Sequence, residues 1–267
     1  MDYTAVLYAV GVLAVIGCIF GAVLSAAGKK LAVKEDKRIG ELKELLGGAN
    51  CGACGYAGCE AFAKAVLAGE AKPGACTVMS EENSVRAGEL LGVSVEKREP
   101  MAAKVLCQGI SGVAKEKYIY EGVRSCRVAA SLAGGPKLCE YACLGLGDCG
   151  GVCAFQAISI SSGVAVIDAG LCKGCGECAQ VCPRGAIRLI PRSQTVNVLC
   201  RNEKNAREAK KECTRACIGC GRCKRECEAG AIEIVNGVAG IDAEKCTRCG
   251  KCAGVCPCGC IEAVLKA

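Results

Sequence analysis

Cysteine is the residue that most constrains this chain. The 267 residues include 27 cysteines and no histidine. Cysteine at this density would suggest a disulfide scaffold in a short secreted chain, but here the cysteines recur as C-x-x-C runs, which are typical of metal sites. Soft thiolates at such spacings select zinc or iron–sulfur clusters. The lack of histidine excludes Cys2His2, Cys3His and Rieske-type sites, and also Ser-His-Asp and Cys-His nucleophile systems.

A long apolar segment opens the chain. Residues 3–28 carry no charged side chain, and roughly 20 apolar residues are enough to cross a bilayer core. We therefore predict a single transmembrane helix over residues 1–29. Five Lys or Arg side chains follow within residues 29–38, so the positive-inside rule places the rest of the chain in the cytoplasm, on the inner side of the cell membrane. A cleaved signal peptide is the alternative, but Asp2 contradicts the basic start of such a signal, and the apolar run continues past Cys18.

A small metal-binding domain is predicted next, over residues 30–90. Apolar side chains at helical spacing indicate a connector helix over residues 31–46, and a second helix is predicted for residues 60–69. Between and after these helices lies the N-terminal set of ligands: Cys51, Cys54, Cys59 and Cys76. Glycines in the loop allow tight backbone turns with N–H groups directed at sulfur. Tetrahedral zinc also accepts four cysteines, so a zinc knuckle is the alternative for this set.

An internal repeat fills the second half of the chain. Module 1, residues 136–192, and module 2, residues 213–267, share five cysteines at the same mutual spacing, and proline follows the last of them. This is the pattern of bacterial two-cluster ferredoxins, and the proline favours ferredoxin over zinc. A short apolar hairpin is predicted inside each module, with turns at Ser162-Gly163 and Asn236-Gly237.

The ferredoxin rule divides each module into two ligand sets, because the fourth cysteine of the C-x2-C-x2-C-x3-C-P run binds the other cluster. The first set of module 2 is predicted as Cys217, Cys220, Cys223 and Cys256. Its second set is Cys227, Cys246, Cys249 and Cys252. The second set of module 1 is Cys153, Cys172, Cys175 and Cys178. Its first set is Cys139, Cys143, Cys149 and Cys182, whose leading trio is more widely spaced than in ferredoxins and is bent inward by a glycine-rich loop.

Seven cysteines remain outside the predicted sets: Cys18, Cys107, Cys126, Cys200, Cys213, Cys258 and Cys260. Those at 107 and 126 fall in a predicted connector, residues 91–135, and are interpreted as free or packed thiols. Those at 200 and 213 flank a basic stretch in a predicted linker, residues 193–212. This stretch is either a solvated face or a docking surface for an acidic ferredoxin. The last two could serve only as alternative ligands.

The formal charge of +7 does not indicate a nucleic-acid partner. Five oxidised 4Fe–4S clusters, each about −2 with its thiolates, would bring the loaded chain to about −3. Few aromatic side chains are present to stack on single strands. The sequence also contains no P-loop and no G-x-G-x-x-G after a strand, so no nucleotide site is predicted. Clusters in series carry single electrons, and the chain is therefore predicted to be a membrane-tethered electron carrier.

The motifs resemble one family in particular. The run NCGACGYAGCEAFA followed by GACTVM, the connector from Cys107 to Gly135 and the widened trio of module 1 are similar to the B subunit of the ion-translocating ferredoxin:NAD oxidoreductase (Rnf) complex. This resemblance implies an α+β chain with one transmembrane helix, a small helical 4Fe–4S domain and two tandem ferredoxin modules, holding five 4Fe–4S clusters in all.

The resemblance also implies a function. B subunits of this family take electrons from reduced soluble ferredoxin and feed the other subunits, which reduce NAD and move Na+ or H+. The chain would then be one subunit of a translocase, without a complete active site of its own. The cation itself would not cross through a single apolar helix. Two alternatives remain: a ferredoxin-like subunit of a hydrogenase or dehydrogenase, and a zinc-binding interaction protein.

Overall fold

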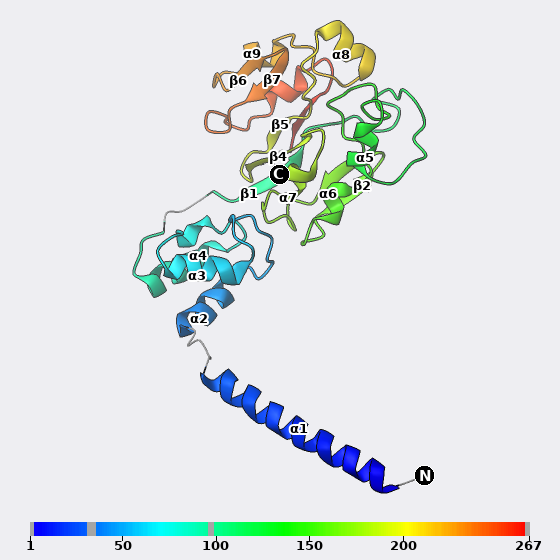
Figure 1. The fold of residues 1–267 in the computed structure, drawn as a ribbon. Helices are drawn as coiled ribbons and strands as arrows, with labels where there is room; N and C mark the ends of the chain where they lie inside the picture. Colours follow the sequence, from blue (N-terminus) through cyan, green and yellow to red (C-terminus); the bar gives the residue numbers. More distant parts are fainter. Residues whose placement is uncertain (1–2, 31–35, 96–98, 265–267) are drawn as a thin grey trace. The chain divides into compact units, whose positions relative to one another are not determined.

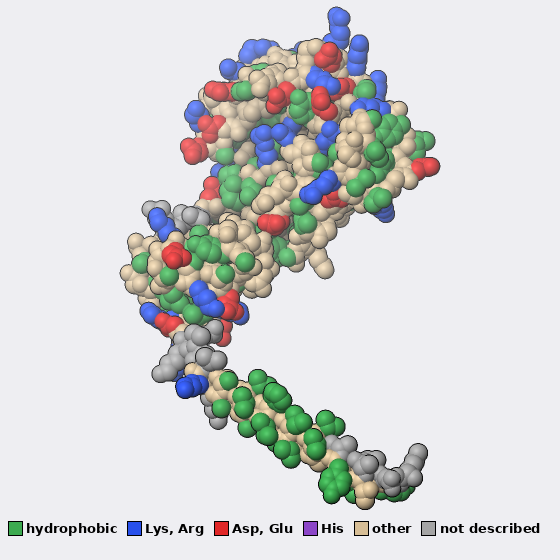
Figure 2. Space-filling view, in the orientation of Figure 1, with side chains coloured by type: hydrophobic (Ala, Val, Ile, Leu, Met, Phe, Trp, Pro, Cys, Tyr) green, Lys and Arg blue, Asp and Glu red, His purple; other side chains and the backbone are tan. Residues whose placement is uncertain are grey.

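The computed structural model describes residues 3–30, 36–95 and 99–264 of the chain (Figure 1). It divides into two units, residues 1–41 and 42–267, each of which is described by itself. The first unit consists mainly of α1 (Tyr3–Lys30), which confirms the helix predicted from the apolar segment. Its segment Val10–Gly28 is long and apolar enough to cross a membrane, and Figure 2 shows hydrophobic side chains around it.

The connector helix is shorter than predicted. α2 spans Lys37–Leu45, and residues 31–35 of the predicted helix lie outside the described residues. Asp36 precedes α2, and its carboxylate accepts a hydrogen bond from the backbone N–H of Arg38 at 3.0 Å. A charged acceptor at this position satisfies one of the free N–H groups of the first turn, which explains where the helix begins.

Three short helices build the small domain that follows. They are α3 (Cys59–Leu67), the 3-10 helix η1 (Pro73–Ala75) and α4 (Glu81–Leu91). Ser80 caps α4 by accepting a hydrogen bond from Asn83 N at 3.2 Å, and Gly92 ends it in a left-handed conformation. Phe62 and Leu42 are each only 1% exposed and form the centre of this domain.

The remaining elements form the two ferredoxin modules. Those of the first half are β1 (Met101–Val105), α5 (Cys126–Ser131), α6 (Asp148–Gly151), β2 (Ile158–Ser161), β3 (Val164–Ile167), α7 (Glu177–Val181) and β4 (Ile187–Pro191). Those of the second half are β5 (Val196–Val198), α8 (Ala206–Glu212), α9 (Arg222–Glu226), β6 (Ile232–Val235), β7 (Val238–Ile241), α10 (Lys251–Gly254) and β8 (Ile261–Ala263). The described strands pair two by two and antiparallel, as β1–β4, β2–β3, β5–β8 and β6–β7.

Both predicted hairpins are present. β2 pairs with β3 and β6 with β7, each around a two-residue turn. Ser162 and Asn236 have φ near +48° and +49°, and the glycine after each also has a positive φ. Two consecutive residues with positive φ are characteristic of the tight hairpin turn that these dipeptides favour.

The repeat extends further toward the N-terminus than the cysteine spacing alone indicates. β1, from the predicted connector, pairs with β4, and β5, from the predicted basic linker, pairs with β8. Val105 lies opposite Ile187 in the first pair, and Val198 lies opposite Ile261 in the second. Each repeat therefore begins with a strand that returns to pair with the end of its own module.

Gly219 marks a close approach between the first-set loop of module 2 and its hairpin. Its φ is +61°, and a Cβ added there would lie 2.7 Å from the carbonyl oxygen of Gly237. We expect Gly219→Ala to destabilise the module by roughly 2 kcal/mol, because a left-handed backbone costs an L residue about 1–2 kcal/mol and the opposing backbone oxygen cannot move aside. Denaturant unfolding followed by circular dichroism measures the effect. Gly151→Ala is the matched control, since open space surrounds Gly151. Equal destabilisation by the two variants would contradict the prediction.

Candidate iron–sulfur centres

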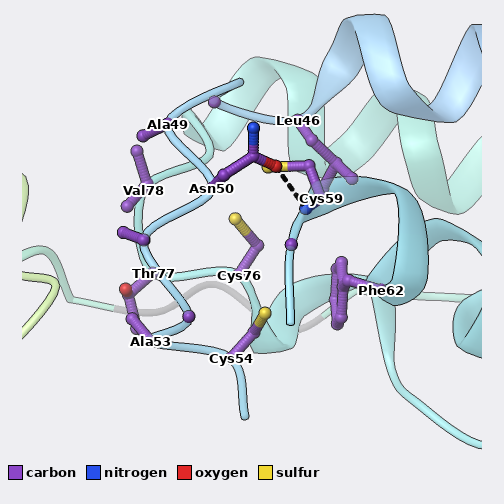
Figure 3. Close-up of a pocket in the computed structure, with 14 residues that line it drawn as sticks. Leu46, Ala49, Asn50, Ala53, Cys54, Cys59, Phe62, Cys76, Thr77 and Val78 are labelled. Atoms are coloured by element: carbon purple, nitrogen blue, oxygen red, sulfur yellow. Dashed lines mark hydrogen bonds between the residues drawn. The ribbon is translucent and has the colours of Figure 1, made fainter. Parts of the chain in front are cut away.

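The N-terminal set surrounds one hollow, and all four of its cysteines line it. Cys51 and Cys54 come from the loop before α3, Cys59 begins α3, and Cys76 follows η1. In Figure 3 the side chains of Cys54 and Cys76 point into the same space. Asn50 holds the loop in place, because its Oδ1 accepts a hydrogen bond from Cys59 N at 2.8 Å, drawn as a dashed line. Phe62 closes the hollow from the α3 side. This geometry suits a group with four thiolate ligands.

The first set of module 2 likewise lines a single hollow, together with Cys258 and Cys260. Burial raises the pKa of Cys223, and the neighbouring Cys217, Cys256 and Cys220 add to the rise. These four thiols therefore lie close enough to influence one another's ionisation. Cys260 is 1% exposed, and its sulfur lies 3.5 Å from that of Cys256.

Second-set cysteines also gather in both modules. Burial raises the pKa of Cys178 to about 12. The thiols of Cys153, Cys172 and Cys175, the other members of its set, add to this rise. In the same way, burial raises the pKa of Cys252 to about 11, and the other three members of its set contribute with Cys223. Bound metal must displace these protons, since the thiolate is the ligand.

In module 1 a cysteine outside the predicted sets, Cys126, lies beside members of the predicted first set. Cys143, and not Cys139, occupies the place that Cys217 has in module 2. The sulfur of Cys143 accepts hydrogen bonds from Ala165 N and Gly145 N. The sulfur of Cys217 accepts them in the same way from the equivalent residues of module 2, Ala239 and Gly219. Leu146 then stands where module 2 has Cys220. Module 1 thus lacks the middle cysteine of the trio.

Cys126 takes the vacant place. It is buried beside Leu144 and Leu146. Burial raises the pKa of Cys149 to about 11, and the neighbouring thiols of Cys143, Cys126 and Cys182 add to this rise. Cys126, Cys143, Cys149 and Cys182 therefore gather in one place, and this group is called the regrouped first set of module 1. The sequence does carry a signal for this grouping: aligning the two modules residue by residue sets Leu146 opposite Cys220 and shows that a ligand is missing.

Asp148 holds Cys126 beside Cys149. Its carboxylate accepts hydrogen bonds from Cys126 N at 2.9 Å, Arg127 N at 3.0 Å and Ser125 Oγ at 3.0 Å. Burial opposes ionisation of Asp148, but these hydrogen bonds outweigh it and lower the pKa of the carboxyl. Since Asp148 directly precedes Cys149, one side chain fixes the start of α5 against the start of α6.

Cys139 lies apart from the set to which the cysteine spacing assigns it. Burial raises its pKa to about 12, and Glu212, Cys107 and Cys200 are the charged or ionisable neighbours that add to the rise. The sequence predicts Cys107 and Cys200 to lie outside the ligand sets. The widened trio is therefore divided between two places in the structure, with Cys139 in one and Cys143 and Cys149 in the other.

All 27 cysteines are free thiols. Among residues 3–30, 36–95 and 99–264, no three Cys, Asp or Glu side chains lie close enough to hold a single metal ion. A 4Fe–4S cluster is larger than an ion, and its four thiolates stand further apart. Four cysteines that line one hollow fit such a cluster, and in the first set of module 2 the backbone N–H groups of Gly219 and Ala239 are directed at the sulfur of Cys217.

Comparison with known families finds iron–sulfur domains in three parts of the chain. Residues 46–78 match a model described as "Putative Fe-S cluster", which covers the N-terminal set. Residues 165–188 match a 4Fe-4S binding domain, and residues 216–260 match a 4Fe-4S dicluster domain. The three matches fall on the small domain, module 1 and module 2.

Relatives extend the similarity to most of the chain. The chain is 40% identical to the B subunit of the Na(+)-translocating ferredoxin:NAD(+) oxidoreductase complex of Acetobacterium woodii, over 90% of this chain and 73% of the relative. It is 39% identical to the B subunit of the ion-translocating oxidoreductase complex of Methanosarcina acetivorans, over 88% and 90%. It is 36% identical to the B subunit of the proton-translocating ferredoxin:NAD(+) oxidoreductase complex of Clostridium ljungdahlii, over 76% and 72%. The chain therefore belongs to the B-subunit family of ion-translocating oxidoreductase (Rnf) complexes.

Proposed function

We propose that this chain is the membrane-anchored electron-input subunit of its complex, which receives electrons from reduced soluble ferredoxin and delivers them to the other subunits. The complex would couple ferredoxin:NAD oxidoreduction to ion translocation. The observation that carries this proposal is the series of four-cysteine sites within one polypeptide that also carries a membrane-length helix. The names of the relatives include both Na+ and H+ translocation, so they do not decide the coupling ion here.

The proposed ligands are the N-terminal set, the regrouped first set and the second set of module 1, and both sets of module 2. When bound, each 4Fe–4S cluster supplies a centre that gains and loses one electron. The chain holds these centres and adjusts them through its backbone. Ala157 N donates to Cys153 Sγ and Ala186 N donates to Cys182 Sγ, each at 3.4 Å. Hydrogen bonds to sulfur raise the reduction potential because they stabilise the extra negative charge of the reduced state.

The anchor and the orientation follow from charge. α1 carries no charged side chain between Tyr3 and Gly28, whereas five Lys or Arg residues follow within residues 29–38. We propose that these residues keep the cluster domains on the cytoplasmic side of the cell membrane. A soluble ferredoxin would then reach the chain directly. The translocated ion would cross through other subunits, because α1 offers no charged group to carry it.

Reduced ferredoxin should reduce the purified chain. The full-length protein, isolated anaerobically in detergent, is titrated with reduced ferredoxin, and the reduced clusters are counted by electron paramagnetic resonance. We expect at least one cluster signal to grow in proportion to the ferredoxin added. Dithionite serves as the control, since it shows the total that can be reduced. If dithionite reduced the clusters and ferredoxin did not, the proposed entry role would be wrong.

A further inference from the structure

The first set of module 2 has a fifth thiol in contact with two of its ligands. Cys260 lines the same hollow as these ligands and is only 1% exposed. Its sulfur lies 3.5 Å from that of Cys256, and its side chain also forms a hydrogen bond with the sulfur of Cys217. Cys260 is not one of the proposed ligands, so this buried contact calls for another role.

The backbone holds Cys260 in this place. Its carbonyl oxygen accepts a hydrogen bond from Leu199 N at 2.7 Å. The carbonyl oxygen of Cys256 accepts one at 3.2 Å from the N–H three residues further on, which closes a tight turn. Directly after Cys260, Ile261 pairs with Val198 in the antiparallel β5–β8 sheet. The turn on one side and the strand on the other therefore fix the position of the thiol.

Module 1 has the same backbone at this position but no thiol. Ala186 follows Cys182 by the same interval at which Cys260 follows Cys256, and both intervals begin with proline. The carbonyl oxygens of Ala186 and Cys260 each accept a hydrogen bond at 2.7 Å from the residue after the first strand of their module. Alanine therefore satisfies the fold at this position, and the backbone does not require the thiol of module 2.

Binding of a cluster leaves one proton among the three sulfurs. A ligand must be a thiolate, so Cys217 and Cys256 lose their protons when they bind metal. Cys260 is not a ligand, and a free thiol is largely neutral at pH 7. Cys260 then holds the one S–H of this group of three, and both sulfurs within its reach are charged acceptors.

A hydrogen bond to a ligand sulfur matters most when the site is reduced. The added electron increases the negative charge on the ligand sulfurs, so a donor to them is more favourable in the reduced state than in the oxidised state. A thiol is a weaker donor than a backbone N–H. Burial compensates for this in part, because the low dielectric of the interior strengthens the hydrogen bond.

We propose that Cys260 raises the reduction potential of the first cluster of module 2 by donating its S–H to the sulfurs of Cys217 and Cys256. One electron enters the site, no bond is broken, and Cys260 keeps its proton. Because Ala186 offers no such donor, the hydrogen bond favours the electron on module 2 over the equivalent site of module 1. This consequence for electron flow rests on the proposed function, whereas the change in potential does not.

Replacement of Cys260 by alanine measures the contribution of its thiol. The full-length protein is isolated anaerobically in detergent and titrated with dithionite, and each cluster is followed by electron paramagnetic resonance. The signal that is lost in Cys217→Ala identifies the cluster concerned. In Cys260→Ala the ratio of reduced to oxidised cluster at a fixed potential should fall about tenfold, the size expected of one hydrogen bond, which corresponds to about 59 mV for one electron. Iron and acid-labile sulfide should stay at the wild-type values, because alanine already occupies the equivalent position of module 1.

Cys260→Ser is the matched variant, because serine keeps a donor and differs from alanine by one hydroxyl group. It should restore the ratio to at least the wild-type value, since O–H donates more strongly than S–H. An equal fall in both variants would assign the effect to packing and overturn the proposal. An unchanged ratio in Cys260→Ala would also overturn it, and so would the loss of about four irons, which would make Cys260 a ligand. Dithionite supplies the electrons in every case, so a failure here is distinguishable from a failure of the proposed function.

Discussion

Removal of iron should unfold both ferredoxin modules rather than leave empty but folded shells. The described core of residues 99–264 consists largely of Ala and Cys, and its largest fully buried side chains are Val196, Asn202 and Cys260. Apolar burial stabilises a fold by about 25 cal/mol per Å², and alanine offers little area. The free energy of cluster binding is therefore folding free energy for these modules, as in other small metal-dependent domains.

Limited proteolysis measures this effect. The anaerobic holoprotein is treated with dithionite and an iron chelator and is then digested with trypsin beside a mock-treated sample. We expect the fragments that cover residues 99–264 to survive in the mock sample and to disappear at least about tenfold faster after chelation, because opening exposes the many Lys and Arg bonds of this region. An apoprotein with the fragment pattern and the circular dichroism of the holoprotein would contradict the prediction.

The local elements of the fold could be predicted because each depends on short-range chemistry. The hairpin turns at Ser162-Gly163 and Asn236-Gly237 need only two adjacent residues that tolerate positive φ, and both are present. α1 needs only an apolar run of sufficient length. α8 (Ala206–Glu212) begins where it does because Asn205 caps it by accepting a hydrogen bond from Glu208 N.

The pairing of distant segments was not predictable from cysteine spacing. A C-x-x-C run brings its own ligands together locally, so the N-terminal set and the sets of module 2 could be proposed from the sequence. Cys126 reaches Cys149 only because Asp148 accepts hydrogen bonds at the start of α5, and no spacing rule encodes such a contact. Cys107 meets Cys213 only because each repeat begins with a strand that pairs with its own end, which a search for cysteine motifs does not detect.

Moving a cysteine from position 126 to position 146 should decide whether Cys126 or Cys139 belongs to the first set of module 1. Cys126→Ala should lose about four irons and one reduced-cluster signal, because it removes a ligand of the regrouped first set of module 1. Leu146 stands where module 2 has a ligand, in a loop whose Gly145 and Gly147 both have positive φ, as Gly219 and Gly221 do in module 2. Cys126→Ala combined with Leu146→Cys should therefore restore the iron content and the signal, because it recreates the trio of module 2.

A cysteine placed elsewhere should not rescue the cluster. Leu132 follows α5 and is 52% exposed, so Leu132→Cys in the Cys126→Ala background adds a thiol of the same chemistry outside the site and should leave the loss unchanged. Leu146→Cys should leave the iron content of Cys139→Ala unchanged, because Cys139 lies outside the regrouped first set. Full iron content in Cys126→Ala, with rescue of Cys139→Ala by Leu146→Cys, would instead return Cys139 to the first set of module 1. The residue whose loss Leu146→Cys repairs is thus identified as the ligand of this cluster. The iron content of single variants cannot identify it.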